Sequence, residues 1–108
     1  MISTHILDTH LGKPANNVEI KLFAADGKLL ATTFTNEDGR VLANDFGLER
    51  IQAGDYSLEF STKSYFSAQH LETFFPKAVV HFSVENAEQH YHIPLLISPF
   101  AYSTYRGS

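Results

Sequence analysis

The chain has 108 residues, of which 44% are hydrophobic and 19% charged, a composition typical of a globular domain that buries one core. Eight Lys and Arg residues stand against twelve Asp and Glu residues, and the basic residues are scattered, so nucleic acid and anionic membrane surfaces are excluded as expected partners. The sequence contains no cysteine, which excludes disulfides, thiol nucleophiles and cysteine-based zinc sites.

The length, and a sequence without linkers or repeats, predict a single domain over residues 1–108. No stretch approaches the roughly 18 consecutive apolar residues of a membrane-spanning helix. Residues 1–8 contain neither a basic region nor a long apolar region, so they do not resemble a signal peptide. We therefore expect a cytoplasmic protein, and a periplasmic one only if a signal peptide has been removed.

Two-residue alternation of apolar and polar side chains marks most of the predicted secondary structure and is typical of half-buried β-strands. In chain order, the predicted strands are 3–8, 18–22, 29–35, 54–60, 78–84, 90–98 and 100–105. Turns with Asp-Gly sequences at 25–28 and 36–39 predict a β-meander in this part of the chain. Seven or eight short strands joined by turns predict an all-β fold, an antiparallel sandwich or barrel.

Two local sequences interrupt the alternation. Residues 67–75 predict the one short helix, with Ser67 as its N-cap and an end near Pro76. Pro94 lies inside a predicted strand and indicates an edge position, a bulge or a strand start, because proline has no N–H to donate.

Six histidines are many for a chain of this length, and histidine is the side chain that titrates near neutral pH. If Ile6 faces the core, alternation places His5 on the opposite face of its strand, where a lone histidine is either structural or catalytic. His90 and His92 share one face of a later strand, a pattern that metal ligands can have. With His5 they would form a three-histidine zinc site, but no fixed spacing supports the third ligand.

Arg40 follows the second turn and is either a solvated surface residue or part of a site. The neighbouring Asp38 and Gly39 look like a fragment of a calcium loop, but the other carboxylates are missing at the required spacing. Serine, histidine and aspartate all occur, yet no Gly-X-Ser-X-Gly sequence marks an activated serine nucleophile. These residues alone therefore favour neither calcium binding nor a serine triad.

Four sequence blocks, in the right order, resemble the signature of the 5-hydroxyisourate hydrolases, the transthyretin-related enzymes of urate breakdown. The blocks are 3–9, 12–15, 35–40 and 91–100 with its continuation 102–108. The tail Tyr105-Arg106-Gly107-Ser108 is the specific part, because the transthyretin carriers are similar in the stretch before it but continue differently and lack the histidine and arginine set. Departures are small, with Ala101 where the family commonly has glycine.

The resemblance implies a transthyretin-like β-sandwich of two four-stranded sheets with one short helix. It implies a homotetramer, a dimer of dimers whose central channel holds the active sites. The implied reaction opens the six-membered ring of 5-hydroxyisourate by hydrolysis and gives 2-oxo-4-hydroxy-4-carboxy-5-ureidoimidazoline, with no cofactor and no metal. The site residues that it implies are His5, Arg40, His92, Tyr105, Arg106, Gly107 and Ser108.

Residue chemistry gives each of these groups an expected role. Either His5 or His92 takes a proton from water near neutral pH, and the other orients the substrate. Arg40 offers a planar set of donors to the carbonyl and to the oxyanion that develops from it. Arg106 shares this role or anchors the tail.

In the tail, Tyr105 and Ser108 can donate hydrogen bonds, the carboxylate of Ser108 can accept them, and Gly107 lets the backbone bend. Ser108 is counted among the catalytic residues for this hydrogen bonding and not as a nucleophile. Two other classes stay open. One is a carrier that binds a small aromatic ligand in the same channel without converting it, and the other is a purely structural sandwich.

Overall fold

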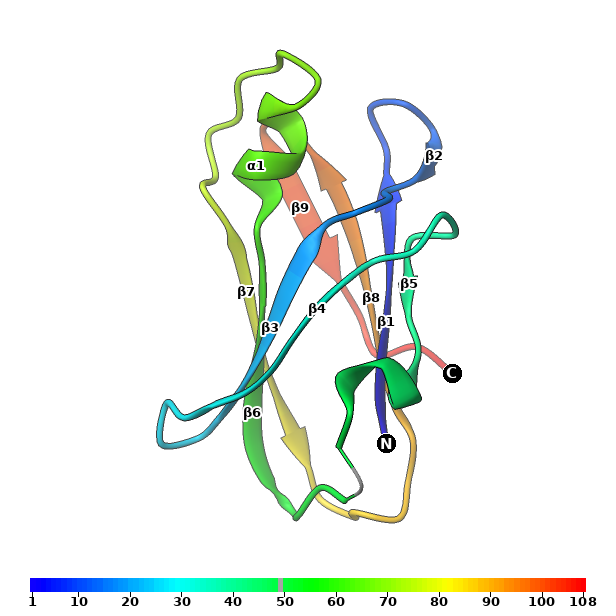
Figure 1. Ribbon diagram of the computed structural model, residues 1–108, viewed down its shortest axis with the longest axis vertical. Helices are drawn as coiled ribbons and strands as arrows, with labels where there is room; N and C mark the ends of the chain where they lie inside the picture. Colours follow the sequence, from blue (N-terminus) through cyan, green and yellow to red (C-terminus); the bar gives the residue numbers. More distant parts are fainter. Residues whose placement is uncertain (49) are drawn as a thin grey trace.

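Two β-sheets lie face to face in the computed structural model, which describes residues 1–48 and 50–108 (Figure 1). The elements are β1 (Ile2–Asp8), β2 (Lys13–Pro14), β3 (Glu19–Ala24), β4 (Leu29–Phe34), β5 (Arg40–Val41), the 3-10 helix η1 (Ala43–Phe46), β6 (Gly54–Phe60), α1 (Thr62–Ser67), β7 (Ala78–Val84), β8 (Tyr91–Ser98) and β9 (Ala101–Thr104). One sheet has the order β2-β1-β8-β9, with β5 also paired to β1, and the other has the order β4-β3-β6-β7. The predicted all-β sandwich with one short α-helix is confirmed.

The first sheet has five strands where four were expected, because two short strands share one edge of β1. β2 pairs with Leu7 and Asp8, and β5 pairs with Thr4 and His5. β5 follows the turn after β4 but joins the opposite sheet, so the expected meander is limited to the hairpin of β3 and β4. β1 and β8 pair in parallel, because strands so far apart in the chain are not constrained by a hairpin.

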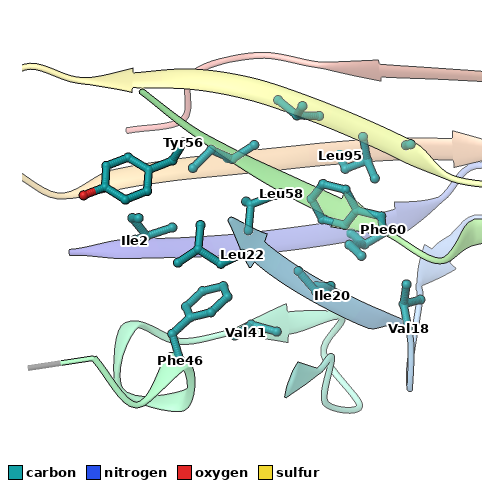
Figure 2. Close-up of a cluster of buried hydrophobic side chains, with 14 of the residues drawn as sticks. Ile2, Val18, Ile20, Leu22, Val41, Phe46, Tyr56, Leu58, Phe60 and Leu95 are labelled. Carbon is teal, nitrogen blue, oxygen red and sulfur yellow. The ribbon is translucent and has the colours of Figure 1, made fainter. Parts of the chain in front are cut away.

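Alternation along the strands fills the space between the sheets with aliphatic and aromatic side chains, as Figure 2 shows. On β3, Ile20 and Leu22 are fully buried while Lys21 between them is half-exposed. The labelled members of this cluster are Ile2, Val18, Ile20, Leu22, Val41, Phe46, Tyr56, Leu58, Phe60 and Leu95. Because each fully buried side chain of this kind contributes about 1.5–3 kcal/mol, this cluster is the main source of stability.

The position predicted for the helix is wrong, because α1 lies upstream of 67–75. Thr62 and Phe66 lie one helical turn apart and are both buried, so contact with the core selects this segment. His70 then adopts a positive φ of 59°, which turns the chain out of the helical direction. Within the described part of the chain, no helix is long and apolar enough to cross a membrane.

Pro94 lies inside β8, at the point where the pairing with β9 ends. The ladder between β8 and β9 starts at Leu95, opposite Thr104. Pro94 is therefore just beyond this ladder, where the missing N–H interrupts no pairing with β9. The hydroxyl of Thr104 donates to the Pro94 carbonyl at 2.7 Å and holds the two strands together there.

A buried carboxylate ties the end of β1 to α1. Asp8 is 0% exposed and accepts hydrogen bonds from the backbone N–H groups of His10 and Leu11 at 2.9 and 3.0 Å. Its second oxygen accepts the Tyr65 hydroxyl at 2.7 Å. Burial, and then the hydrogen bond and charge of Asp8, raise the pKa of Tyr65 above its ordinary value, so this hydroxyl stays a donor.

Candidate active site

His5, Arg40 and His92 come together on the outer face of the five-stranded sheet. Ile6 is fully buried, so alternation along β1 turns His5 outward. His5 is paired with Arg40 of β5 on one side and with Pro94 of β8 on the other. His92 lies two residues before Pro94 and therefore shares this face.

A tight turn fixes Arg40 in this position. The Asn36 side-chain oxygen accepts the backbone N–H groups of Asp38 and Arg40 at 2.9 and 3.0 Å. Gly39 has a φ of 72°, and a Cβ at this position would lie 2.5 Å from the carbonyl oxygen of Ile6. Only glycine fits between this turn and β1, so the turn holds Arg40 opposite His5.

The surroundings of His92 lower the pKa of its imidazole. Burial lowers the pKa of His92 below its ordinary value, and electrostatic repulsion from Arg40, and from His90 and His5 whenever they carry a second proton, lowers it further. A neutral imidazole near neutral pH can take a proton from water, while the neighbouring guanidinium attracts negative charge. The candidate site therefore places an imidazole of lowered pKa near a cation.

Ser3 bonds to two of the histidines. Its hydroxyl oxygen lies 2.7 Å from Nε2 of His90 and 2.8 Å from Nδ1 of His92. Ser3 and His92 are direct partners in the parallel pairing of β1 with β8, which brings the hydroxyl beside the ring. Ser3 has no role among the residues predicted for the site, although alternation puts it on the same face as His5.

The tail lies against His92. The Gly107 N–H donates to the His92 carbonyl at 2.9 Å, and a Cβ on Gly107 would lie 2.5 Å from Cδ2 of that ring and 3.0 Å from Cγ of Pro94. Figure 1 accordingly shows the chain after β9 turning across β8 and β1 toward β5. The close approach needs a residue without a side chain, so Gly107 brings the tail over the site.

Arg106 points elsewhere. Its guanidinium carbon lies 4.8 Å from the centroid of the Tyr91 ring, and Nη2 lies 3.5 Å from the side-chain oxygen of Gln89. Tyr91 is buried on the face of β8 opposite to His92. The structure thus places Arg106 at the end of the sandwich beside β8, while Tyr105 is 61% exposed and Ser108 is also exposed.

Two cavities flank this arrangement. The one of about 300 Å³ is lined by β7, by the start of β8, by Thr104 of β9 and by Tyr105 and Arg106 of the tail. A larger one of about 1010 Å³ lies between η1 and the residues around Met1 and Glu88, and none of the predicted site residues lines it. This larger cavity is therefore not the candidate active site, because the predicted site residues lie elsewhere.

The three-histidine metal site considered from the sequence is not assembled. Among residues 1–48 and 50–108, no three or more His, Asp or Glu side chains are grouped so that they could hold a metal ion. Instead, Nε2 of His90 and Nδ1 of His92 both lie against the Ser3 hydroxyl.

The sequence is similar to known hydrolases over its whole length. The model of the HIUase/transthyretin family matches residues 2–107. The 5-hydroxyisourate hydrolase of Pseudomonas aeruginosa is 40% identical, over 99% of this chain and 90% of that protein. The 5-hydroxyisourate hydrolase of Salmonella dublin is 44% identical, over 100% of this chain and 81% of that protein.

The fold is about equally similar to solved structures of a 5-hydroxyisourate hydrolase and of a transthyretin. Klebsiella pneumoniae 5-hydroxyisourate hydrolase has a TM-score of 0.88 at 38% identity, covering 99% of this chain and 92% of that one. Transthyretin from Sparus aurata has a TM-score of 0.89 at 34% identity, covering 98% of this chain and 95% of that one. The backbone alone does not separate the two classes. With the family-model match and relatives of this identity over nearly its full length, the chain belongs to the HIUase/transthyretin family.

Proposed function

We propose that this chain is a 5-hydroxyisourate hydrolase. The observation that carries the proposal is the cluster of His5, Arg40 and His92 on one sheet face, with the pKa of His92 lowered and Gly107 against its ring. The full-length similarity to proteins of that name supports it. The reaction adds water across the cyclic acyl C–N bond of 5-hydroxyisourate and opens its six-membered ring.

In the proposed mechanism His92 is the general base. Its neutral imidazole takes a proton from water as the water oxygen attacks the carbonyl carbon, and Arg40 stabilises the oxyanion that forms. The C–N bond then breaks, the carbonyl re-forms as a carboxylic acid, and the departing ring nitrogen takes the proton back from the imidazolium. His5, paired with Arg40, orients the substrate beside it.

The tail closes this site in the proposal. Gly107 contacts the ring of His92, so the tail covers the candidate site beside this ring. Tyr105 and Ser108 supply exposed hydroxyls that can bind the substrate, and Ser108 is assigned to hydrogen bonding and not to nucleophilic attack. Arg106 is assigned to anchoring the tail, because its guanidinium lies over Tyr91.

A direct assay tests the activity. We expect that 5-hydroxyisourate, generated fresh with urate oxidase, loses its ultraviolet absorbance faster when the protein is added. The rate should scale with protein concentration and should survive treatment with a chelator, because the proposal uses no cofactor and no metal. No acceleration over the spontaneous decay would overturn the proposal.

The alternative is a carrier that binds a small aromatic ligand without converting it. This alternative rests on the similarity to a sea bream transthyretin that was solved in complex with thyroxine, with a TM-score of 0.89 and 34% identity. It predicts saturable ligand binding and no acceleration in the same assay. Titrating thyroxine and 5-hydroxyisourate against the protein therefore separates the two functions.

We propose that the protein assembles as a homotetramer, a dimer of dimers. Both sheets offer a free edge strand on the same side of the sandwich, β7 in one and β9 in the other, and all four residues of β9 are exposed. Apolar Leu7 and Leu42 are exposed on the face that carries the site. Sedimentation at increasing protein concentration tests the assembly, and a monomer at all concentrations would contradict it.

Two further expectations stay proposals. One transthyretin-like domain over 1–108 is supported by the family match to residues 2–107, and a single cooperative unfolding transition would test it. A cytoplasmic location stays a prediction, which fractionation of the source cells would test.

A further inference from the structure

The hydroxyl of Ser3 connects two imidazole rings. Its oxygen lies 2.7 Å from Nε2 of His90 and 2.8 Å from Nδ1 of His92, both within hydrogen-bond distance. Ser3 is only 6% exposed, so water competes little for this oxygen. The strand pairing fixes the contact, because Ser3 on β1 is the direct partner of His92 on β8.

The number of protons limits how this contact can be made. A serine hydroxyl has one proton to donate and accepts with its lone pairs, while a neutral imidazole carries a proton on only one nitrogen. The two ring nitrogens that face Ser3 therefore cannot both be unprotonated if both hydrogen bonds are made. With both rings neutral, Ser3 either donates to one histidine and accepts from the other, or accepts an N–H from both.

His92 can act as a base at Nε2 only in an arrangement in which its Nδ1–H donates to Ser3. Nδ1 of His92 is occupied by Ser3, so Nε2 is the nitrogen left for substrate or water. Gly107 lies against Cδ2, the ring atom bonded to Nε2, which puts that side of the ring at the tail. Nε2 is unprotonated in a neutral ring only when the proton sits on Nδ1.

We propose that Ser3 and His90 are positioning residues that select this tautomer of His92. The Ser3 hydroxyl donates to Nε2 of His90 and accepts the Nδ1–H of His92, so that Nε2 of His92 keeps its lone pair for the reacting water. The proposal rests on the proposed function for its catalytic consequence. The hydrogen-bond chain itself can be tested without substrate.

The first test measures the tautomer. Long-range ¹H–¹⁵N NMR of the full-length, ¹⁵N-labelled protein distinguishes an N–H nitrogen from an unprotonated one in each imidazole. We expect His92 to be protonated at Nδ1 in the wild type and to shift toward Nε2–H, the form favoured by imidazole free in water, in Ser3→Ala and His90→Phe. Unchanged His92 signals in both variants would overturn the proposal.

The second test measures turnover. We expect Ser3→Ala and His90→Phe to lower kcat about tenfold or more and to change KM little, because the base is present but in the wrong tautomer. Ser3→Thr keeps a hydroxyl and should restore much of the loss. His10→Gln removes an exposed histidine from the turn after β1 and is the matched control, with kcat as in the wild type.

The two proposals fail in different ways. A wild type that does not hydrolyse 5-hydroxyisourate contradicts the proposed function, whereas the NMR result still decides on the hydrogen-bond chain. A wild type that hydrolyses the substrate and keeps its kcat in both Ser3→Ala and His90→Phe contradicts the positioning role. His90 is exposed, so His90→Phe tests the role even if Ser3→Ala does not fold.

Discussion

A histidine that accepts a proton from water works only while it is uncharged. The pKa of His92 is lowered first by its burial and then by the charges of Arg40, His90 and His5. Raising the pH through this lowered pKa removes the proton, so kcat/KM should rise with pH and have its midpoint below the pKa of about 6.5 of an ordinary histidine. A pH profile of kcat/KM measures this, and a midpoint above about 6.5 would contradict it.

Arg40 contributes to this shift, so its removal should be visible at His92. Arg40→Gln takes away a positive charge, which makes the protonated imidazole less unfavourable, and the pKa of His92 should therefore rise toward its ordinary value. An NMR titration of His92 measures the change. Arg106→Gln is the matched control, because Arg106 is not among the charges that shift His92, and it should leave this pKa unchanged.

Gly107 is a residue whose replacement by alanine should affect catalysis more than folding. Its Cβ would lie 2.5 Å from the His92 ring, so the ring or the tail has to move in Gly107→Ala. A displacement of about 1 Å can cost about 100-fold in rate, and we expect a loss of that order in kcat/KM with an unchanged circular dichroism spectrum.

Gly27→Ala gives the matched comparison for Gly107→Ala. Gly27 lies in the turn between β3 and β4 with a φ of 87°, and nothing lies within 4 Å of the added Cβ. This variant should lose stability through backbone strain and keep its kcat/KM. Equal kcat/KM for the two variants would argue against contact between the tail and the site.

Among the elements, local sequence predicts the bounds of two strands correctly but not the position of α1. The strands β6 and β7 have the bounds predicted from alternation, because each has one face on the core and one outside. The helix was predicted downstream because Ser67 and Pro76 are typical of helix ends. Burial of Thr62 and Phe66 decides its position instead, and burial depends on where the chain returns to the core.

The link between β1 and α1 gives a stability prediction. Tyr65→Phe removes the hydroxyl that donates to the fully buried carboxylate of Asp8, and we expect a loss of about 1–3 kcal/mol in the free energy of unfolding. Urea unfolding measures the loss, and kcat at a temperature well below the transition should stay near the wild-type value. Tyr105→Phe, which removes an exposed hydroxyl, is the control and should unfold like the wild type.

At the scale of the whole molecule, the tail should matter for turnover and not for folding. Residues 105–108 follow the last strand and contribute no residue to the buried core. A chain that ends at residue 104 should therefore keep its circular dichroism spectrum and its sedimentation behaviour while losing turnover of 5-hydroxyisourate. Undiminished activity in this truncated chain would remove the tail from the proposed site.

The candidate site was predictable from the sequence only through the resemblance to a family. Alternation placed His5 on an outward face and paired His90 with His92, but it left Arg40 an ordinary surface residue. The contact of Ser3 with both histidines depends on the register between β1 and β8. That register follows from how the two sheets close around the core, so no local pattern in the sequence encodes it.

The pairing of β1 with β8 also has a consequence for when the site can form during folding. The contact of Ser3 with His92 spans 89 positions in the chain, and the entropy of closing such a loop has to be overcome before the pairing stabilises anything. A high contact order of this kind is associated with slow folding. Because the residues of the site lie on both strands, a chain still being synthesised has no site until β8 has been released from the ribosome, and the activity should be among the last properties to appear.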